Sequence, residues 1–169
     1  MPDGAYTIRR MRAADASAVA ELLRASWRET YEHLMGLEKV EAANARMHVP
    51  ERLAAEAEDD SVIAFVAEGP DGAIVGHALA MMDAKRQVWL DRLHVAPKLF
   101  GSGLAANLLR AILAAHAGLS TIALEVIEGN DRAIAFYRKH GFAVTDRKSS
   151  CGSVEGVPTL VMTKILSRA

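Results

Sequence analysis

The stretch LHVAPKLFGSGLAANLL, residues 93–109, decides how the rest of this chain is interpreted. It begins as the end of a strand, passes Pro97, and turns at Gly101 and Gly103 into a helix with a leucine-rich face. A Gly-x-Gly turn that opens a helix leaves backbone N–H groups unpaired, and the helix dipole places partial positive charge behind them. Because such a helix start binds anions, the stretch predicts a phosphate cradle.

Two other phosphate-binding patterns compete for this stretch. The P-loop of the nucleoside triphosphatases is excluded, because no Gly-Lys-Ser/Thr follows the turn. The dinucleotide pattern G-x-G-x-x-A fits Gly101, Gly103 and Ala106, with Glu125 about 20 residues further on. That pattern, however, directly follows a strand and begins an alternating β-α-β array. Here residues 96–100 intervene and most strands precede the helix, which disfavours dinucleotide binding.

Composition excludes several classes of protein. A chain of 169 residues without repeats or linkers predicts one domain with a single core. The net charge of −1, with acidic and basic residues interspersed, argues against a nucleic-acid partner. The N-terminus lacks an apolar signal core, and no apolar run is long enough to span a membrane. Together with a single cysteine, Cys151, which cannot form an internal disulfide, this favours the cytoplasm. The six histidines lack metal-ligand spacing, so no metal site is expected.

Hydrophobic periodicity and turn residues predict the order of the elements. The first third reads as a strand at 6–11, then a helix with Asp15 as its N-cap. Two or three short helices are expected from 26 to about 57, because Gly36 and Pro50 break the pattern there. The elements expected after these are strands 62–67, 73–82 and 88–95, helix 102–117, strand 121–126, helix 131–139, and strands 143–148 and 159–166.

The three strands from 62 to 95, joined by short turns, predict an antiparallel meander. Helix 102–117 then makes a right-handed crossover, so that strand 121–126 runs parallel to strand 88–95. The fold class is therefore α/β (α+β) with a mixed sheet, in the order β-α-α-β-β-β-α-β-α-β-β. Ligands of such sheets bind where neighbouring strands diverge, and here that point lies beside the glycine turn.

Two motifs together resemble the GNAT superfamily of acyl-CoA-dependent N-acyltransferases. Val95-Ala96-Pro97 followed by FGSGLA, residues 100–105, is similar to that family's pyrophosphate signature Q/R-x-x-G-x-G/A. LEVIEGNDRAIAFYRKHGF, residues 124–142, is similar to its strand, asparagine and tyrosine-bearing helix that ends in Gly-Phe. The element order also agrees over nearly the full chain. One position departs from the signature: Phe100 stands where the family has Gln or Arg, which removes a polar side-chain contact.

The resemblance implies a GNAT-like, mostly antiparallel splayed sheet of about seven strands with helices on both faces, in one N-acetyltransferase domain over residues 1–169. It also implies acetyl-CoA as the donor, with its diphosphate on the N–H groups of the glycine turn. The pantetheine arm would pair with the end of strand 88–95, and an N–H near Val95 would stabilise the oxyanion. Asn130 would contact pantetheine, cap the following helix, or do both. The implied donor-binding set is Leu93, His94, Val95, Phe100, Gly101, Ser102, Gly103, Leu104, Ala105, Ala106, Asn130 and Tyr137.

The resemblance also implies two catalytic residues. An alkyl amine has a pKa of about 10 and reaches the site protonated, so a base must remove a proton before it attacks the thioester. Glu125 matches the family's proposed base, which often acts through water, although it could equally be a salt-bridged strand residue. Tyr137 matches the tyrosine that protonates the leaving thiolate, although it also falls on an apolar helical stripe.

The acceptor is less well defined. Trp27, Glu29 and Tyr31 fall where the family walls the acceptor side, and an aromatic or acidic wall suits a cationic amine. The alternative is that Trp27 and Tyr31 are core residues one helical turn apart. A primary amine of a small molecule, peptide or protein is expected, and a homodimer through the final strand, 159–166, is plausible. The competing function is a non-catalytic, CoA-binding regulatory module, which Phe100 favours and which Glu125, Asn130 and Tyr137 together oppose.

Overall fold

The computed structural model describes residues 6–150 and 152–166, which form one seven-stranded sheet with helices on both faces. The spatial order of the strands is β1-β2-β3-β4-β5-β7-β6. The strands are β1 (Thr7–Arg10), β2 (Val62–Glu68), β3 (Ile74–Met82), β4 (Val88–Val95), β5 (Thr121–Ile127), β6 (Ala143–Lys148) and β7 (Thr159–Ile165). The helices are α1 (Ala16–Met35), α2 (Leu37–Met47), α3 (Pro50–Glu58), α4 (Leu104–Ala115) and α5 (Asp131–Lys139), with short 3-10 turns at Ala13–Asp15 and Pro97–Leu99.

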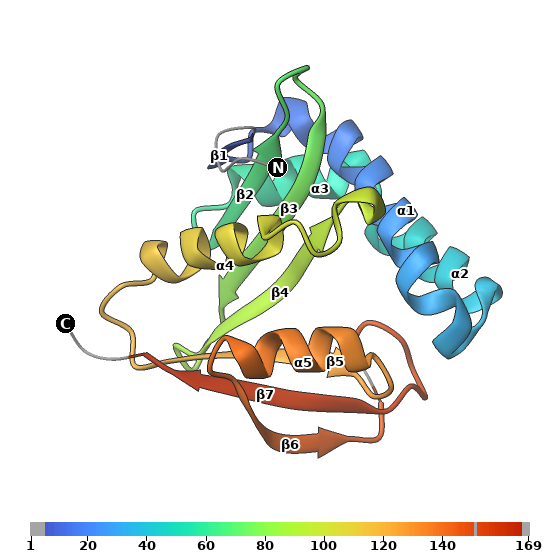
Figure 1. Cartoon of the computed structure of the whole chain (residues 1–169), viewed down its shortest axis with the longest axis vertical. Coiled ribbons are helices and arrows are strands. Elements are labelled where there is room, and N and C mark those ends of the chain that lie inside the picture. The colour runs from blue at the N-terminus through green and yellow to red at the C-terminus, as the bar shows by residue number, and fades with distance from the viewer. Residues whose placement is uncertain (1–5, 151, 167–169) are drawn as a thin grey trace.

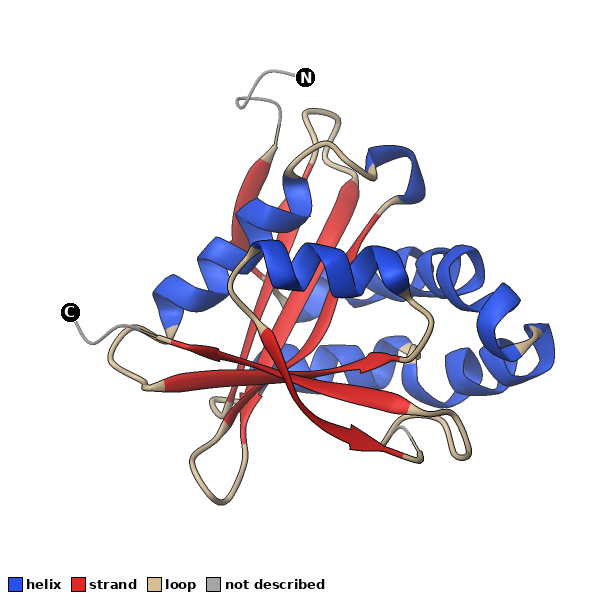
Figure 2. Ribbon diagram, turned by 60° about the horizontal axis from the view of Figure 1, so that its bottom comes forward, coloured by secondary structure: helices blue, strands red, loops and turns tan. Residues whose placement is uncertain are grey.

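The predicted fold class is confirmed. Strands β1 to β4 pair antiparallel, β4 and β5 pair parallel, and β5, β7 and β6 pair antiparallel. Helix α4 packs on β2 to β4, and α5 lies over the β5–β7–β6 half on the same side of the sheet (Figure 1). Helices α1 and α3 pack on the other face of β2 to β4, and α2 packs on α1. Figure 2 shows the two halves of the sheet diverging in direction.

The divergence has a local cause in β4. Opposite β3, Leu79 pairs with Arg92 while the next residue, Ala80, pairs with Leu90, so Asp91 is the extra residue of a β-bulge. The parallel ladder with β5 ends at the same place, because its last pair is Leu90 with Leu124. Since a bulge bends and twists its strand, β4 leaves β5 at Asp91. Among the residues that the structure describes, no strand pairs with the remainder of β4 on that side.

Burial of apolar side chains holds each layer in place. On the α4 face, Leu104, Leu108 and Ile112 pack onto the sheet, spaced as one helical stripe and almost wholly buried. A second cluster joins α1 and α3 to β2 and β3. Fully burying one such side chain stabilises the fold by roughly 1.5–3 kcal/mol. The glycine turn therefore stands at the end of a rigid helix.

Two details of the N-terminal third differ from the prediction. Three helices lie between β1 and β2, one more than in the predicted element order, because Gly36 (φ 86°) ends α1 and Pro50 begins a new helix, α3, after α2 has ended at Met47. The first of them runs without interruption from Ala16 to Met35. Asp15 precedes it but does not cap it with its side chain, because its carboxylate pairs with Arg9 and accepts from the N–H of Arg12.

The argument for dimerisation through the final strand is wrong. Strand β7 lies between β5 and β6 and is hydrogen-bonded on both sides, so it offers no free edge. Within the described residues the edges of the sheet are β1 and β6. The homodimer itself stays a prediction. Cys151 lies outside the described residues. None of the described helices combines the length and apolar character needed to cross a bilayer.

Candidate functional site

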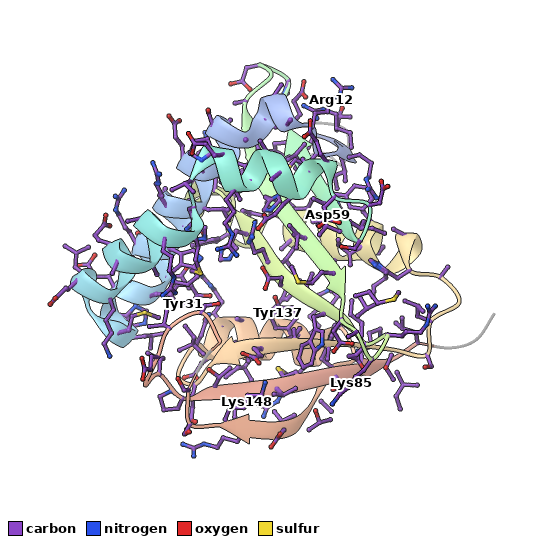
Figure 3. The ribbon with its side chains drawn as sticks, turned by 180° about the vertical axis from the view of Figure 1, so that it is seen from behind. Arg12, Tyr31, Asp59, Lys85, Tyr137 and Lys148 are labelled. Atoms are coloured by element: carbon purple, nitrogen blue, oxygen red, sulfur yellow. The ribbon has the colours of Figure 1, made fainter. Side chains whose placement is uncertain are left out.

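A pocket of about 450 Å³ opens where β4 and β5 separate. Its walls come from α1, the bulged half of β4, the loop before α4, the end of β5 and one face of α5. These segments are distant in sequence and meet because the sheet splays at Asp91. Figure 3 labels two of the side chains at this pocket, Tyr31 of α1 and Tyr137 of α5. The predicted ligand site at the divergence of the strands is therefore a real cavity.

One end of the pocket is the glycine turn. Gly101 and Gly103 have φ angles of 79° and 86°, which an L-residue adopts only with strain. Within the described residues, the N–H groups of Gly101, Gly103, Ala105 and Ala106 have no backbone acceptor. They lie at the start of the 12-residue helix α4, where the dipole favours an anion. The turn therefore has the backbone geometry of an anion-binding helix start, and phosphate binding there stays a prediction.

The middle of the pocket is the free edge of β4. The N–H of Ala96 donates to the carbonyl of Val75 in the neighbouring segment, at 2.8 Å. Because successive N–H groups of a strand point to opposite sides, those of Val95 and Leu93 face the side that β5 has left. An extended ligand can pair with this edge as an additional strand would.

Helix α5 forms the facing wall. Its first turn is capped by Asn130, whose side-chain oxygen accepts from the N–H of Ala133 at 3.3 Å. Tyr137 follows two turns later and packs edge-on against Phe136 and Phe142. Burial raises the pKa of the Tyr137 phenol well above its usual range, and the neighbouring Tyr31 raises it further. Tyr137 is therefore a protonated donor at any working pH.

Two carboxylates lie at the other end, beyond the bulge. Glu125 of β5 pairs with Lys148 of β6 and also accepts from the N–H of Gly152, at 3.4 Å. Lys148 in turn lies 5.5 Å from the ring centre of Trp89. Figure 3 labels Lys148 on its strand. The alternative that Glu125 is salt-bridged is thus the arrangement observed, and the ion pair leaves this carboxylate little unbalanced charge.

The second carboxylate, Asp91, was not among the predicted site residues. Burial raises the pKa of the Asp91 carboxyl, and the negative charges of Glu56 and Glu125 add to the rise. The guanidinium of Arg92, with Nε 3.3 Å from Asp91, opposes the rise only in part, and Arg52 opposes it weakly. Arg92 is itself held by Glu56 of α3 through two contacts of 2.7 Å. Asp91 is therefore a partly exposed carboxylate at the free edge of β4, and its pKa is raised.

A family profile matches most of the sequence. The Acetyltransferase (GNAT) family profile covers residues 16–142, which is more than half of the chain. The chain belongs to the GNAT acetyltransferase family. The resemblance based on the two motifs is thereby confirmed, and the matched region contains both of them.

Two curated relatives match part of the sequence, and a solved structure shares the fold. An uncharacterised N-acetyltransferase of Mycobacterium bovis is 37% identical over 81 residues, which are 47% of this chain and 52% of that protein. Streptothricin acetyltransferase of Streptomyces lavendulae is 38% identical over 92 residues, which are 53% of this chain and 49% of that protein. The chain thus matches about half the length of these curated relatives. PaiA N-acetyltransferase from Thermoplasma acidophilum, solved in complex with coenzyme A, superposes with a TM-score of 0.80 at 23% identity, covering 95% of this chain and 99% of that one.

In this GNAT chain most of the predicted donor-binding residues converge on the pocket. The exceptions are Ser102 and Leu104, which do not line it. Leu104, the first residue of α4, is buried in the hydrophobic core. The Ser102 hydroxyl accepts a hydrogen bond from the Leu104 N–H at 3.3 Å. The His94 ring nitrogen Nδ1 and the Ser26 hydroxyl of α1 form a hydrogen bond of 2.9 Å. Those that line the pocket are Leu93, His94, Val95, Phe100, Gly101, Gly103, Ala105, Ala106, Asn130 and Tyr137.

Of the predicted acceptor residues, only Tyr31 lines the pocket. Trp27 is buried between α1 and α2 and packs edge-on against Tyr31 and His48, so the core interpretation holds for it. Glu29 is exposed and lies outside the pocket. The signal that could have identified Asp91 is the lone carboxylate in the strand pattern VWLDRLHV, in which the flanking positions are mostly apolar. The β-bulge that directs Asp91 toward the pocket has no recognisable sequence pattern.

Proposed function

We propose that this protein transfers an acetyl group from acetyl-CoA to a primary amine of a small molecule, peptide or protein by direct attack on the thioester. One observation carries the proposal: a single pocket connects the unpaired N–H groups of a helix start with two carboxylates, and an unpaired strand edge and a partly buried phenol lie between them. The order of these groups matches the order of chemical groups from the diphosphate of CoA to the reacting amine.

The donor end fits the diphosphate of CoA. Nothing lies within 4 Å of the place that a Cβ would occupy at Gly101 or at Gly103, so the turn is open toward the pocket. The unpaired N–H groups of the turn would bind phosphate oxygens, and the edge N–H groups of Leu93 and Val95 would bind the pantetheine arm and the acyl carbonyl. When bound, acyl-CoA supplies the activated thioester carbonyl; the protein supplies the donors that stabilise its developing negative charge.

Replacing Gly103 with Ala separates backbone strain from phosphate binding. At φ 86° a Cβ costs about 1–2 kcal/mol, and Gly103→Ala should lower the free energy of unfolding accordingly. The matched control is Gly72→Ala in the turn between β2 and β3, where φ is 79° and space is equally open. Both variants should be destabilised alike in urea titrations, whereas only Gly103→Ala should weaken CoA binding, roughly tenfold. Equal CoA affinity of the two variants would contradict a cradle at Gly103.

The acceptor end fits a protonated amine. Asp91 and Glu125 face the pocket from the two diverging strands, and an ammonium between them would be attracted to both. Because Glu125 is paired with Lys148, we assign removal of the amine proton to Asp91, with its raised pKa, and positioning of the amine to Glu125. The neutral amine then attacks the carbonyl carbon and forms a C–N bond. As the C–S bond breaks, the phenol of Tyr137 donates its proton to the departing sulfur, and the resulting phenolate takes back the second proton from the amide nitrogen.

The test is release of CoA thiol from acetyl-CoA across a panel of amines. The panel contains alkyl diamines, free amino acids, peptides with different N-termini and streptothricin, the last because one curated relative carries that name. Turnover with at least one amine, and a product heavier by one acetyl group in mass spectrometry, would support the proposal. Binding of CoA without turnover on any amine would favour the regulatory module. Thermal stabilisation by NAD but not by CoA would favour the dinucleotide alternative.

A further inference from the structure

The irregular position of the pyrophosphate signature, Phe100, has a cationic partner from another element. The guanidinium carbon of Arg132, in the first turn of α5, lies 3.7 Å from the centre of the Phe100 ring. That separation is van der Waals contact between stacked groups, and a cation over an aromatic face is favourable. Both side chains line the pocket, and Phe100 directly precedes the glycine turn. A guanidinium is therefore held beside the cradle from the opposite wall.

We propose that Arg132 is a donor-binding residue that contacts the diphosphate of acyl-CoA, with Phe100 as the platform that orients it. In this arrangement the cationic side chain comes from α5 and replaces the polar side chain that position 100 lacks. The inference rests on the proposed function, because it assumes that acyl-CoA is the donor.

The geometry leaves Arg132 able to take a ligand. A guanidinium carries five N–H donors in one plane, and stacking on Phe100 occupies a face of that plane rather than its edges. The described residues offer it one hydrogen bond, from Nη2 to the hydroxyl of Thr30, at the long distance of 3.5 Å. The N–H groups along the edge of the guanidinium can donate two parallel hydrogen bonds to two oxygens of a phosphate.

The charge of Arg132 is also unbalanced. None of the ion pairs among residues 6–150 and 152–166 includes it. Its positive charge reaches across the pocket, because it contributes, after burial and Arg92, to holding the pKa of His94 down at about 4. By contrast, the pocket's carboxylates, Asp91 and Glu125, each lie near a basic side chain. The pocket therefore offers an uncompensated cation near the cradle, where an anionic ligand is expected.

A purely structural role must be distinguished from this one. Arg132 contacts Phe100 in the loop before α4 and Thr30 in α1, so it could simply tie three elements together. Such a tie would affect every ligand of the pocket alike. A phosphate contact would affect only ligands that carry the diphosphate.

The experiment is calorimetric titration of CoA, 3′-dephospho-CoA and pantetheine into wild type, Arg132→Gln, Phe100→Leu and the double variant. Gln keeps a planar group but removes the charge. Arg132→Gln should weaken both CoA and 3′-dephospho-CoA by about 10- to 100-fold, as expected for a charged hydrogen bond. The pantetheine affinity, measured on the same samples, should not change. Phe100→Leu should weaken CoA by about 2- to 5-fold, and the double variant should bind no worse than Arg132→Gln.

Arg138→Gln is the matched control, because Arg138 lies on the same helix, is exposed and does not line the pocket. Unchanged CoA affinity of Arg132→Gln, or equal losses for CoA and pantetheine, would overturn the inference. A loss for CoA that is absent with 3′-dephospho-CoA would overturn it too, because the contact would then be to the 3′-phosphate. A wild-type protein that binds no CoA would overturn the proposed function itself, whereas the preceding outcomes leave that function standing.

Discussion

Tyr137→Phe should lower kcat by about 100-fold or more while leaving the KM for acetyl-CoA within about twofold of wild type. The phenol is partly buried and packs edge-on against Phe136 and Phe142, and its raised pKa keeps it protonated. It can therefore act as an acid toward the departing sulfur but not as the base that deprotonates the incoming amine. Phe keeps the ring and its packing and removes only the proton donor. Steady-state kinetics with the best amine from the acceptor screen measures the effect.

Tyr6→Phe is the control for this substitution. Tyr6 is partly buried against the same hydrophobic core as Tyr137 but does not line the pocket, so its loss of a hydroxyl should leave kcat unchanged. An unaltered kcat for Tyr137→Phe would remove the phenol from the mechanism and leave Tyr137 as a packing residue of the helical stripe.

Asp91→Asn should lower kcat/KM by about 100-fold or more, because it removes the group proposed to take the proton from the amine. Protonation of Asp91 should be visible in the pH dependence of kcat/KM of the wild-type enzyme. Since the pKa of Asp91 is raised in the folded protein, its base form is lost as pH falls through that raised value. The acidic limb of kcat/KM should therefore lie at higher pH than the pKa of an unperturbed aspartate would give, and it should disappear in Asp91→Asn. The groups that face Asp91 and set its pKa are Arg92, Glu56, Arg52 and Glu125.

Glu125→Gln, assayed in parallel, decides between the two carboxylates. If Glu125 only positions the amine, this variant should raise the KM for the amine and keep the acidic limb of the profile. If Glu125→Gln loses the limb while Asp91→Asn keeps it, the base is Glu125, as the family resemblance implies. Asp71→Asn, in the exposed turn between β2 and β3, controls for a change of net charge.

The parts of the site that sequence could predict are those whose conformation is local. Gly101 and Gly103 adopt positive φ angles within one turn, and α4 starts immediately after them, so the cradle follows from a few adjacent residues. The same holds for Asn130, whose side chain caps the helix three residues ahead. The N-terminal helices were less well predicted, because the weak pattern after Ser26 did not reveal that α1 continues to Met35.

The parts that sequence could not predict depend on register between strands and on contacts between distant elements. Asp91 enters the pocket because β3 and β4 pair with a bulge at that residue, and no local pattern specifies the bulge. Glu125 pairs with Lys148 across the intervening strand β7, and this strand order, which also puts the final strand inside the sheet, is not specified by any local pattern. Phe100 looked like a loss of function in the motif, yet α5 places Arg132 over its ring.

The sequence by itself therefore determined the proposed donor half of the site, a helix start and a strand end whose binding groups belong to the backbone and depend little on the side chains around them. The tertiary structure alone decided the acceptor half and the electrostatics. Those depend on which charges lie near one another across β4, β5, β6, α3 and α5, and charge interactions depend on distance in space rather than along the chain.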